Sequence, residues 1–153
     1  MGVVNANRIP SRRVVFVIPC AAGKADEARP AAELYTSVFF RQALAAARSE
    51  VADADIYVLS AAHGLLALDD EVAPYDLKMG DAGSVDVPTL AVQALGRGLV
   101  DAEVYALLPR SYFDRLDEAL RIFDTYATPV YEATGGIGDQ KHVCSVLADR
   151  EAA

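Results

Sequence analysis

The 153-residue sequence has no tryptophan and only two cysteines and two histidines. Cys20 and Cys144 lie far apart and make no metal-binding spacing, so we expect no bound metal and no cofactor. The longest apolar run, around residues 14–19, is far shorter than the roughly 20 residues that a membrane span needs. Nothing resembles a secretory leader. These absences predict a cytoplasmic protein that makes no contact with a membrane.

Basic side chains are also scarce. Lysine and arginine number 14 against 22 acidic residues, which gives a formal net charge of −8. A surface this negative repels a phosphate backbone, so we expect no broad, salt-driven coating of DNA or RNA. Any contact with a nucleotide or a nucleic acid must therefore come from a local cluster of basic residues.

The pattern of the remaining residues predicts a single domain. Residues 1–13 have no periodicity and read as a flexible leader, and residues 14–150 form the domain. Apolar, β-branched runs predict strands at 14–18, 56–59, 103–108 and 128–131. Helical patterns occupy 31–49, 87–96, a stretch from 111 and a last one from about 139, while 60–85 has no regular pattern. This alternation predicts an α/β fold, a three-layer sandwich on a mostly parallel sheet with right-handed crossovers.

Polar residues follow each predicted strand. Because ligands bind at the carboxyl ends of the strands in such sheets, these residues are candidates for one shared site. After the first three strands they are Cys20 and Lys24, then Ser60 and His63, then Arg110, Ser111 and Tyr112. The fourth connection supplies Gly136, Gly138, Gln140 and Lys141.

Each of these residues also has a purely structural interpretation. Cys20 suits a small buried thiol, His63 suits a core turn, and Ser111 fits a helix N-cap with Asp114 three residues later. The glycines near residue 136 fit an ordinary loop. The segment around Lys24 is no Walker A motif, although Gly23 would let the backbone approach a ligand and Lys24 would offer its charge to a phosphate.

The long stretch 60–85 supplies the candidate carboxylates. It mixes apolar residues with Asp69, Tyr75 and Asp76, and long irregular connections inside compact domains are often functional. A buried carboxylate there would need a partner or a shifted pKa.

The motifs of this region resemble those of a known family. Leu59-Ser60, Gly64-Leu65-Leu66, Leu68-Asp69 and the run Pro74-Tyr75-Asp76-Leu77-Lys78-Met79-Gly80 are similar to the central pattern of the YaaA-like superfamily. Ser111-Tyr112-Phe113 and the Pro19–Lys24 loop resemble further motifs, the latter in a branch of short bacterial and phage proteins of unknown function. Ala21 and His63 depart from the pattern, which has serine and tyrosine there. The resemblance implies a fold akin to that of uracil-DNA glycosylases and a link to DNA binding, oxidative stress and modified-base metabolism.

Three functional hypotheses remain open. The first is an enzyme that acts on a nucleobase or its N-glycosidic bond, with Asp76 or Asp69 as the carboxylate, His63 or Lys24 as the donor, and Tyr75 and Tyr112 stacking on the base. The second is a non-catalytic nucleotide- or DNA-binding protein of a stress-response or phage-related pathway. The third is thiol chemistry at Cys20 with Lys24 lowering the pKa. The expected partner is a nucleotide or a nucleobase-containing ligand, with DNA or RNA bound only at a local site.

Overall fold

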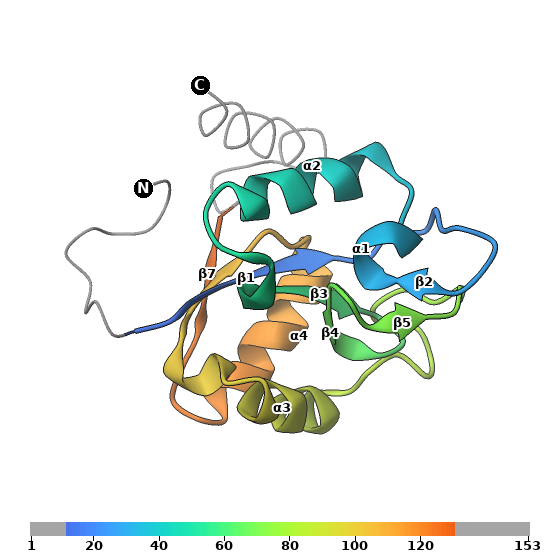
Figure 1. Cartoon of the computed structure of the whole chain (residues 1–153). Coiled ribbons are helices and arrows are strands. Elements are labelled where there is room, and N and C mark those ends of the chain that lie inside the picture. Colours follow the sequence, from blue (N-terminus) through green and yellow to red (C-terminus); the bar gives the residue numbers. More distant parts are fainter. Residues whose placement is uncertain (1–11, 131–153) are drawn as a thin grey trace.

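The structure of the protein, a computed structural model, describes residues 12–130 (Figure 1). Its centre is a five-stranded sheet in the order β4-β3-β1-β6-β7. The strands are β1 (Val14–Pro19), β3 (Ile56–Ser60), β4 (Gly64–Ala67), β6 (Glu103–Ala106) and β7 (Ala127–Pro129). β1 pairs in parallel with β3 and β6, β6 pairs in parallel with β7, and β4 returns antiparallel to β3. The predicted mostly parallel α/β sheet is therefore confirmed.

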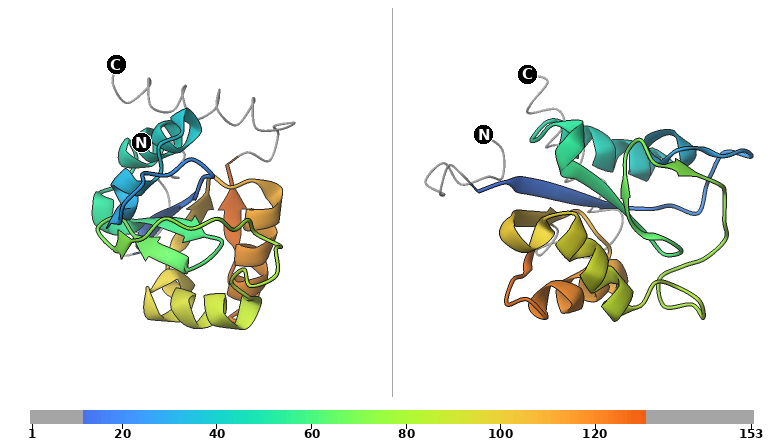
Figure 2. Two further views of the ribbon diagram at one scale, coloured as in Figure 1. Left: turned by 90° about the vertical axis from the view of Figure 1, so that its right-hand side faces the viewer. Right: turned by 60° about the horizontal axis from the view of Figure 1, so that its bottom comes forward.

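Helices cover both faces of this sheet. α1 (Ala31–Leu34) and α2 (Val38–Arg48) lie on one face, and α3 (Val87–Gly96) and α4 (Arg110–Arg121) lie on the other (Figures 1 and 2). All six residues of β1 are buried, with Phe16 and Ile18 in the core under α2, and Val15 and Val17 in the core against α3 and α4. This burial on both faces is what a continuous apolar strand predicts. Two 3₁₀ helices (Asp53–Asp55 and Leu99–Asp101) precede β3 and β6.

The helix predicted over 31–49 is broken, and that prediction was wrong in detail. Tyr35 is extended (φ −87°, ψ 124°), and its backbone pairs with Lys24 in an antiparallel bridge. Ser37 then caps α2 by accepting a hydrogen bond from the Phe40 backbone N–H. Val38, the first residue of α2, is 63 % exposed.

The stretch 60–85, predicted to be irregular, contains two strands. β4 forms a hairpin with β3, and β5 (Glu71–Val72) pairs with β2 (Arg29–Pro30) in a separate two-stranded sheet. Backbone N–H groups of Ala31 and Ala32 donate to the carbonyls of Asp70 and Leu68. These bonds place the segment that follows β4 beside the segment that follows β1.

The remaining elements within residues 12–130 match the predictions closely, whereas the helix predicted from about residue 139 lies outside the described residues. α3 has the predicted bounds, β7 lies within a residue of its expected start, and β6 ends two residues early. α4 begins at Arg110 with Pro109 as its N-cap and no side-chain cap. Ser111 therefore lies inside the first turn, and its predicted capping role was wrong. No helix within residues 12–130 has the length and apolar character that crossing a bilayer requires.

Candidate ligand-binding site

The connections that leave β1 and β6 diverge, which creates a topological switch point. The chain after β1 passes to α1 and α2 on one face, whereas the chain after β6 passes to α4 on the other. Ligands in open α/β sheets bind in the crevice outside the strands at such a point. Cys20 directly follows β1, and its Sγ lies 3.4 Å from the hydroxyl of Tyr112 in the first turn of α4. The predicted polar residues of two neighbouring strands therefore meet at the switch point.

Lys24 reaches the same region from the loop after β1. Backbone bonds from Ala25 N–H to Leu34 O and from Thr36 N–H to Gly23 O hold this loop against the extended residue Tyr35. The Lys24 ammonium lies 4.4 Å from the ring centroid of Tyr75 and 5.8 Å from that of Tyr35. It donates a hydrogen bond of 3.3 Å to its own loop, at Ala22 O. Lys24 is half-buried and forms no ion pair with a carboxylate of residues 12–130.

A chain of hydroxyl groups runs beneath the ammonium. Ser60, fully buried at the end of β3, donates a 2.7 Å hydrogen bond to the hydroxyl of Tyr75. The Tyr75 hydroxyl lies 2.6 Å from that of Tyr35. Ser60 Oγ in turn accepts the backbone N–H groups of Ala62 and His63, at 3.2 and 3.0 Å. Tyr35 was not among the predicted site residues, because the sequence pattern placed it on a helix face.

Burial keeps these phenols protonated. It raises the pKa of Tyr35 to about 12, and it raises the pKa of Tyr75 further, with the electrostatic interaction with Cys20 as the next cause. Burial and the hydrogen bond with Cys20 also raise the pKa of Tyr112. At neutral pH the three hydroxyls are therefore available as hydrogen-bond donors.

The turn that carries His63 is fastened by a residue of α3. Gln93 accepts the Leu65 N–H at 2.8 Å and donates to His63 O at 3.0 Å. Gly64 has φ +76°, and a Cβ there would lie 2.0 Å from Gln93 Oε1, so any other residue would be strained and would displace the Gln93 side chain. The exposed His63 ring meets the Tyr75 ring edge-on, with centroids 5.2 Å apart. The clamp by Gln93 escaped sequence analysis because the two partners are separated by 30 positions.

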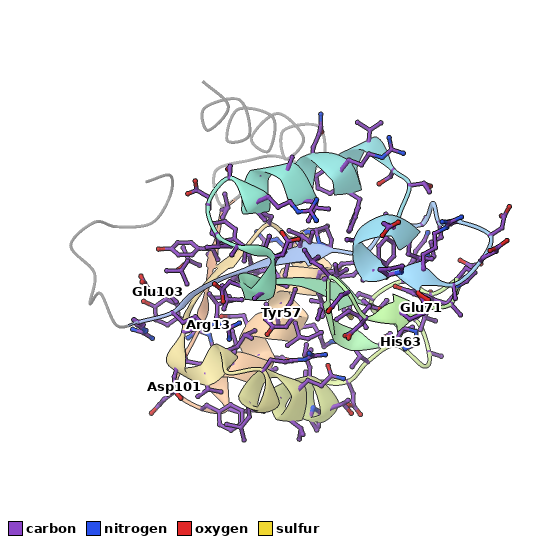
Figure 3. The ribbon with its side chains drawn as sticks, viewed as in Figure 1. Arg13, Tyr57, His63, Glu71, Asp101 and Glu103 are labelled. Atoms are coloured by element: carbon purple, nitrogen blue, oxygen red, sulfur yellow. The ribbon has the colours of Figure 1, made fainter. Side chains whose placement is uncertain are left out.

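These contacts, together with the electrostatic effect of Cys20 on the pKa values of Tyr35 and Tyr75, define the switch-point cluster. It contains six of the predicted site residues together with Tyr35: Cys20, Lys24, Tyr35, Ser60, His63, Tyr75 and Tyr112. His63 lies at one end of the molecule and Arg13, Asp101 and Glu103 at the other (Figure 3).

Other predicted residues lie outside this cluster. The side chains of Asp69 and Asp76 are exposed, and within residues 12–130 they form no hydrogen bond or ion pair with it. Arg110 and Ser111 are exposed on the first turn of α4. Asp70, next to Asp69 in the chain, does have partners: it accepts from Arg97 at 3.1 Å and from Ala67 N–H at 2.9 Å. The predicted residues Gly136, Gly138, Gln140 and Lys141 lie outside the described residues.

The arrangement favours ligand binding through donors. Lys24 contributes a positive charge, and the hydroxyls of Tyr75 and Tyr112 contribute neutral donors. Within the described ranges, no group of three or more His, Cys, Asp or Glu residues is placed to hold a metal ion. The cluster is therefore suited to a ligand that accepts hydrogen bonds and carries negative charge.

Comparison with known protein families identifies the family of this chain. Residues 15–145 match the family of unknown function DUF6884. The chain belongs to this family. The DUF6884 match spans every strand of the central sheet except the first residue of β1, and it contains the whole switch-point cluster. No curated protein and no solved structure matches the chain.

Proposed function

We propose that the protein binds a small anionic ligand, a nucleotide or a related nucleobase compound, at the switch-point cluster. The observation that carries this proposal is the environment of the Lys24 ammonium. Its half-buried ammonium lies against the Tyr75 ring and has no carboxylate partner in residues 12–130. A cation–π contact offsets part of the cost of withdrawing an ammonium from water, by about 0.5–2 kcal/mol. An anionic group of a ligand would supply the missing counter-charge.

The nucleobase part of the proposal rests on the sequence motifs. Their resemblance to the YaaA-like superfamily supports a ligand of this class, and kinship with that superfamily and a uracil-DNA-glycosylase-like fold belong to the same proposal. The net charge of −8 favours a small ligand over a long duplex, because only local contacts offset the repulsion. If the ligand is DNA or RNA, we expect the protein to contact a single exposed nucleotide or the end of a strand.

Calorimetric titration of the full chain with mononucleotides, inorganic phosphate and a short single-stranded oligonucleotide tests this proposal. We expect saturable binding of a phosphate-bearing ligand that weakens as salt is added. Lys24→Met should lower the affinity about 10- to 100-fold, the effect of losing a hydrogen bond to a charged group. Lys78→Met, which removes the same charge from an exposed side chain, is the matched control and should change the affinity less than about twofold. Equal effects of the two variants would refute a site at Lys24.

A second candidate function is the release of a base from a bound nucleotide. What supports it is the position of Asp76, which directly follows Tyr75 on the same loop. A carboxylate there could stabilise positive charge on the sugar while a donor of the cluster meets the departing base. Chromatography of reaction mixtures would detect the free base.

For that function we expect Asp76→Asn to stop base release while nucleotide binding persists. Asp101→Asn, at the opposite end of the molecule, should leave both unchanged (Figure 3). Base release that continues unchanged in the Asp76 variant would show that Asp76 is not the carboxylate of this reaction.

A further inference from the structure

The hydroxyl chain of Ser60, Tyr75 and Tyr35 can be analysed by counting donors and acceptors. A hydroxyl group has one proton and two lone pairs. The two lone pairs of Ser60 Oγ are filled by the backbone N–H groups of Ala62 and His63. Ser60 can therefore act only as a donor, and the acceptor of its proton is the Tyr75 hydroxyl.

This count leaves one proton over. The contact of 2.6 Å between the Tyr75 and Tyr35 hydroxyls uses one phenol proton, whichever ring donates it. Ser60 also lies close enough to Tyr35 to lower the pKa of that phenol. Ser60 Oγ nevertheless has no lone pair left to accept the proton of Tyr35. Of the three hydroxyl protons, two are therefore used within the chain and one is not.

Burial identifies the ring that offers the surplus proton. The Tyr35 side chain is 2 % exposed, whereas Tyr75 is half-buried and lies under the Lys24 ammonium. If Tyr75 donated to Tyr35, the surplus proton would lie on the buried Tyr35 hydroxyl with no acceptor in residues 12–130, which is unfavourable. The favoured direction is therefore from Tyr35 to Tyr75. The Tyr75 hydroxyl then accepts two hydrogen bonds, and its own proton is free to leave the chain. Donors that point at a phenol oxygen polarise it and strengthen the bond that it donates.

We propose that the Tyr75 hydroxyl donates this surplus proton to an oxygen atom of the ligand group that Lys24 attracts. The group bound is then an oxyanion, a phosphate or a carboxylate, held by one charged donor and one neutral donor. This inference rests on the proposed function, since it assumes an anionic ligand at Lys24. It adds that Tyr75 is a ligand-contacting residue and that Ser60 and Tyr35 act through it as positioning residues.

Phenylalanine variants test the donor count, with inorganic phosphate and acetate as probes in calorimetric titration. Tyr75→Phe keeps the ring beneath Lys24 and removes the donor, so it should weaken phosphate binding about tenfold or more. In Tyr35→Phe, the Tyr75 hydroxyl still accepts a hydrogen bond from Ser60 and can still donate its own proton to the ligand. This variant should therefore weaken phosphate binding clearly less than Tyr75→Phe. Tyr57→Phe removes a buried hydroxyl that accepts from Arg13, away from the cluster, and is the control.

A spectroscopic measurement keeps the test independent of stability. In proton NMR of the wild-type chain, phosphate should shift a slowly exchanging phenol hydroxyl resonance downfield, and Tyr75→Phe should remove that resonance. Equal affinities of wild type and Tyr75→Phe, or equal losses in Tyr75→Phe and Tyr35→Phe, would overturn the inference. If Lys24→Met still weakens binding about 10- to 100-fold in that case, the proposed function stands and only the role of Tyr75 falls.

Discussion

Replacing Gly64 with alanine perturbs the turn between β3 and β4, which carries Ser60 and His63 into the switch-point cluster. Gly64 has φ +76°, and the new Cβ would lie 2.0 Å from Oε1 and 2.8 Å from Cδ of Gln93. Gln93 cannot remain in place against such a contact. Its two hydrogen bonds, with Leu65 N–H and His63 O, must break.

The expected cost has two parts. A left-handed conformation costs a residue other than glycine about 1–2 kcal/mol. The two hydrogen bonds of Gln93 are worth about 1 kcal/mol each. We therefore predict that Gly64→Ala lowers the free energy of unfolding by about 3–4 kcal/mol. In a Gln93→Ala background the same change should cost only the backbone part, about 1–2 kcal/mol.

Urea unfolding followed by far-ultraviolet circular dichroism measures all four corners of this double-mutant cycle. Gly83→Ala is the matched control, because Gly83 also has a positive φ (+89°) but a Cβ there meets nothing within 4 Å. It should cost about 1–2 kcal/mol in any background. If Gly64→Ala costs the same with and without Gln93, or no more than Gly83→Ala, Gln93 does not clamp the turn.

Two further predictions concern stability. Arg13 bonds to Asp55 at 2.6 Å and to the carbonyls of Arg97 and Ala54, so Arg13→Lys, which cannot make this fork of bonds, should destabilise by about 1–3 kcal/mol in urea unfolding. Arg48→Lys at the exposed pair with Asp53 should cost less than about 1 kcal/mol, and equal costs would contradict this prediction. Because burial raises the pKa of Tyr35 from about 10 to about 12, the unfolded chain loses this proton first, and stability should fall as the pH rises from about 10 to 12. Absorbance at 295 nm should then show part of the tyrosines ionising only as the protein unfolds, and ionisation of all tyrosines near pH 10 in a folded protein would contradict it.

The layers of the fold were predictable from the sequence because the central strands carry a strong local pattern. β1 is a run of buried β-branched and aromatic residues, and such a run fits only a strand covered on both faces. The break at Tyr35 was not predictable, because the residues around it keep a helical spacing and the bridge to Lys24 is a tertiary contact. β4 was missed for a similar reason, since Gly64–Ala67 is a short apolar run without alternation and becomes a strand by pairing with β3.

The candidate site was predictable where the rule for strand ends applied. That rule correctly placed Cys20, Lys24, Ser60 and Tyr112 near one edge of the sheet. The rule for strand ends does not show whether an acidic residue of the stretch 60–85 faces the cluster, because exposed carboxylates and hydrogen-bonded carboxylates look alike in sequence. In the structure Asp70 bonds to Arg97 and Asp81 accepts from the Lys78 N–H, and neither carboxylate bonds to the cluster. The roles of Tyr35 and Gln93 depend on contacts between distant segments, which a single sequence does not reveal.

The central claim is that an anionic ligand binds at Lys24. Amide chemical shifts of the isotope-labelled full chain, followed during titration with a mononucleotide, test it most directly. We predict saturable shifts concentrated in residues 22–25, 60–64 and 75–79, which in Lys24→Met require about 10- to 100-fold more ligand. Shifts concentrated around Arg13 and Asp101 at the opposite end of the molecule, or a response that Lys24→Met leaves unchanged, would contradict it.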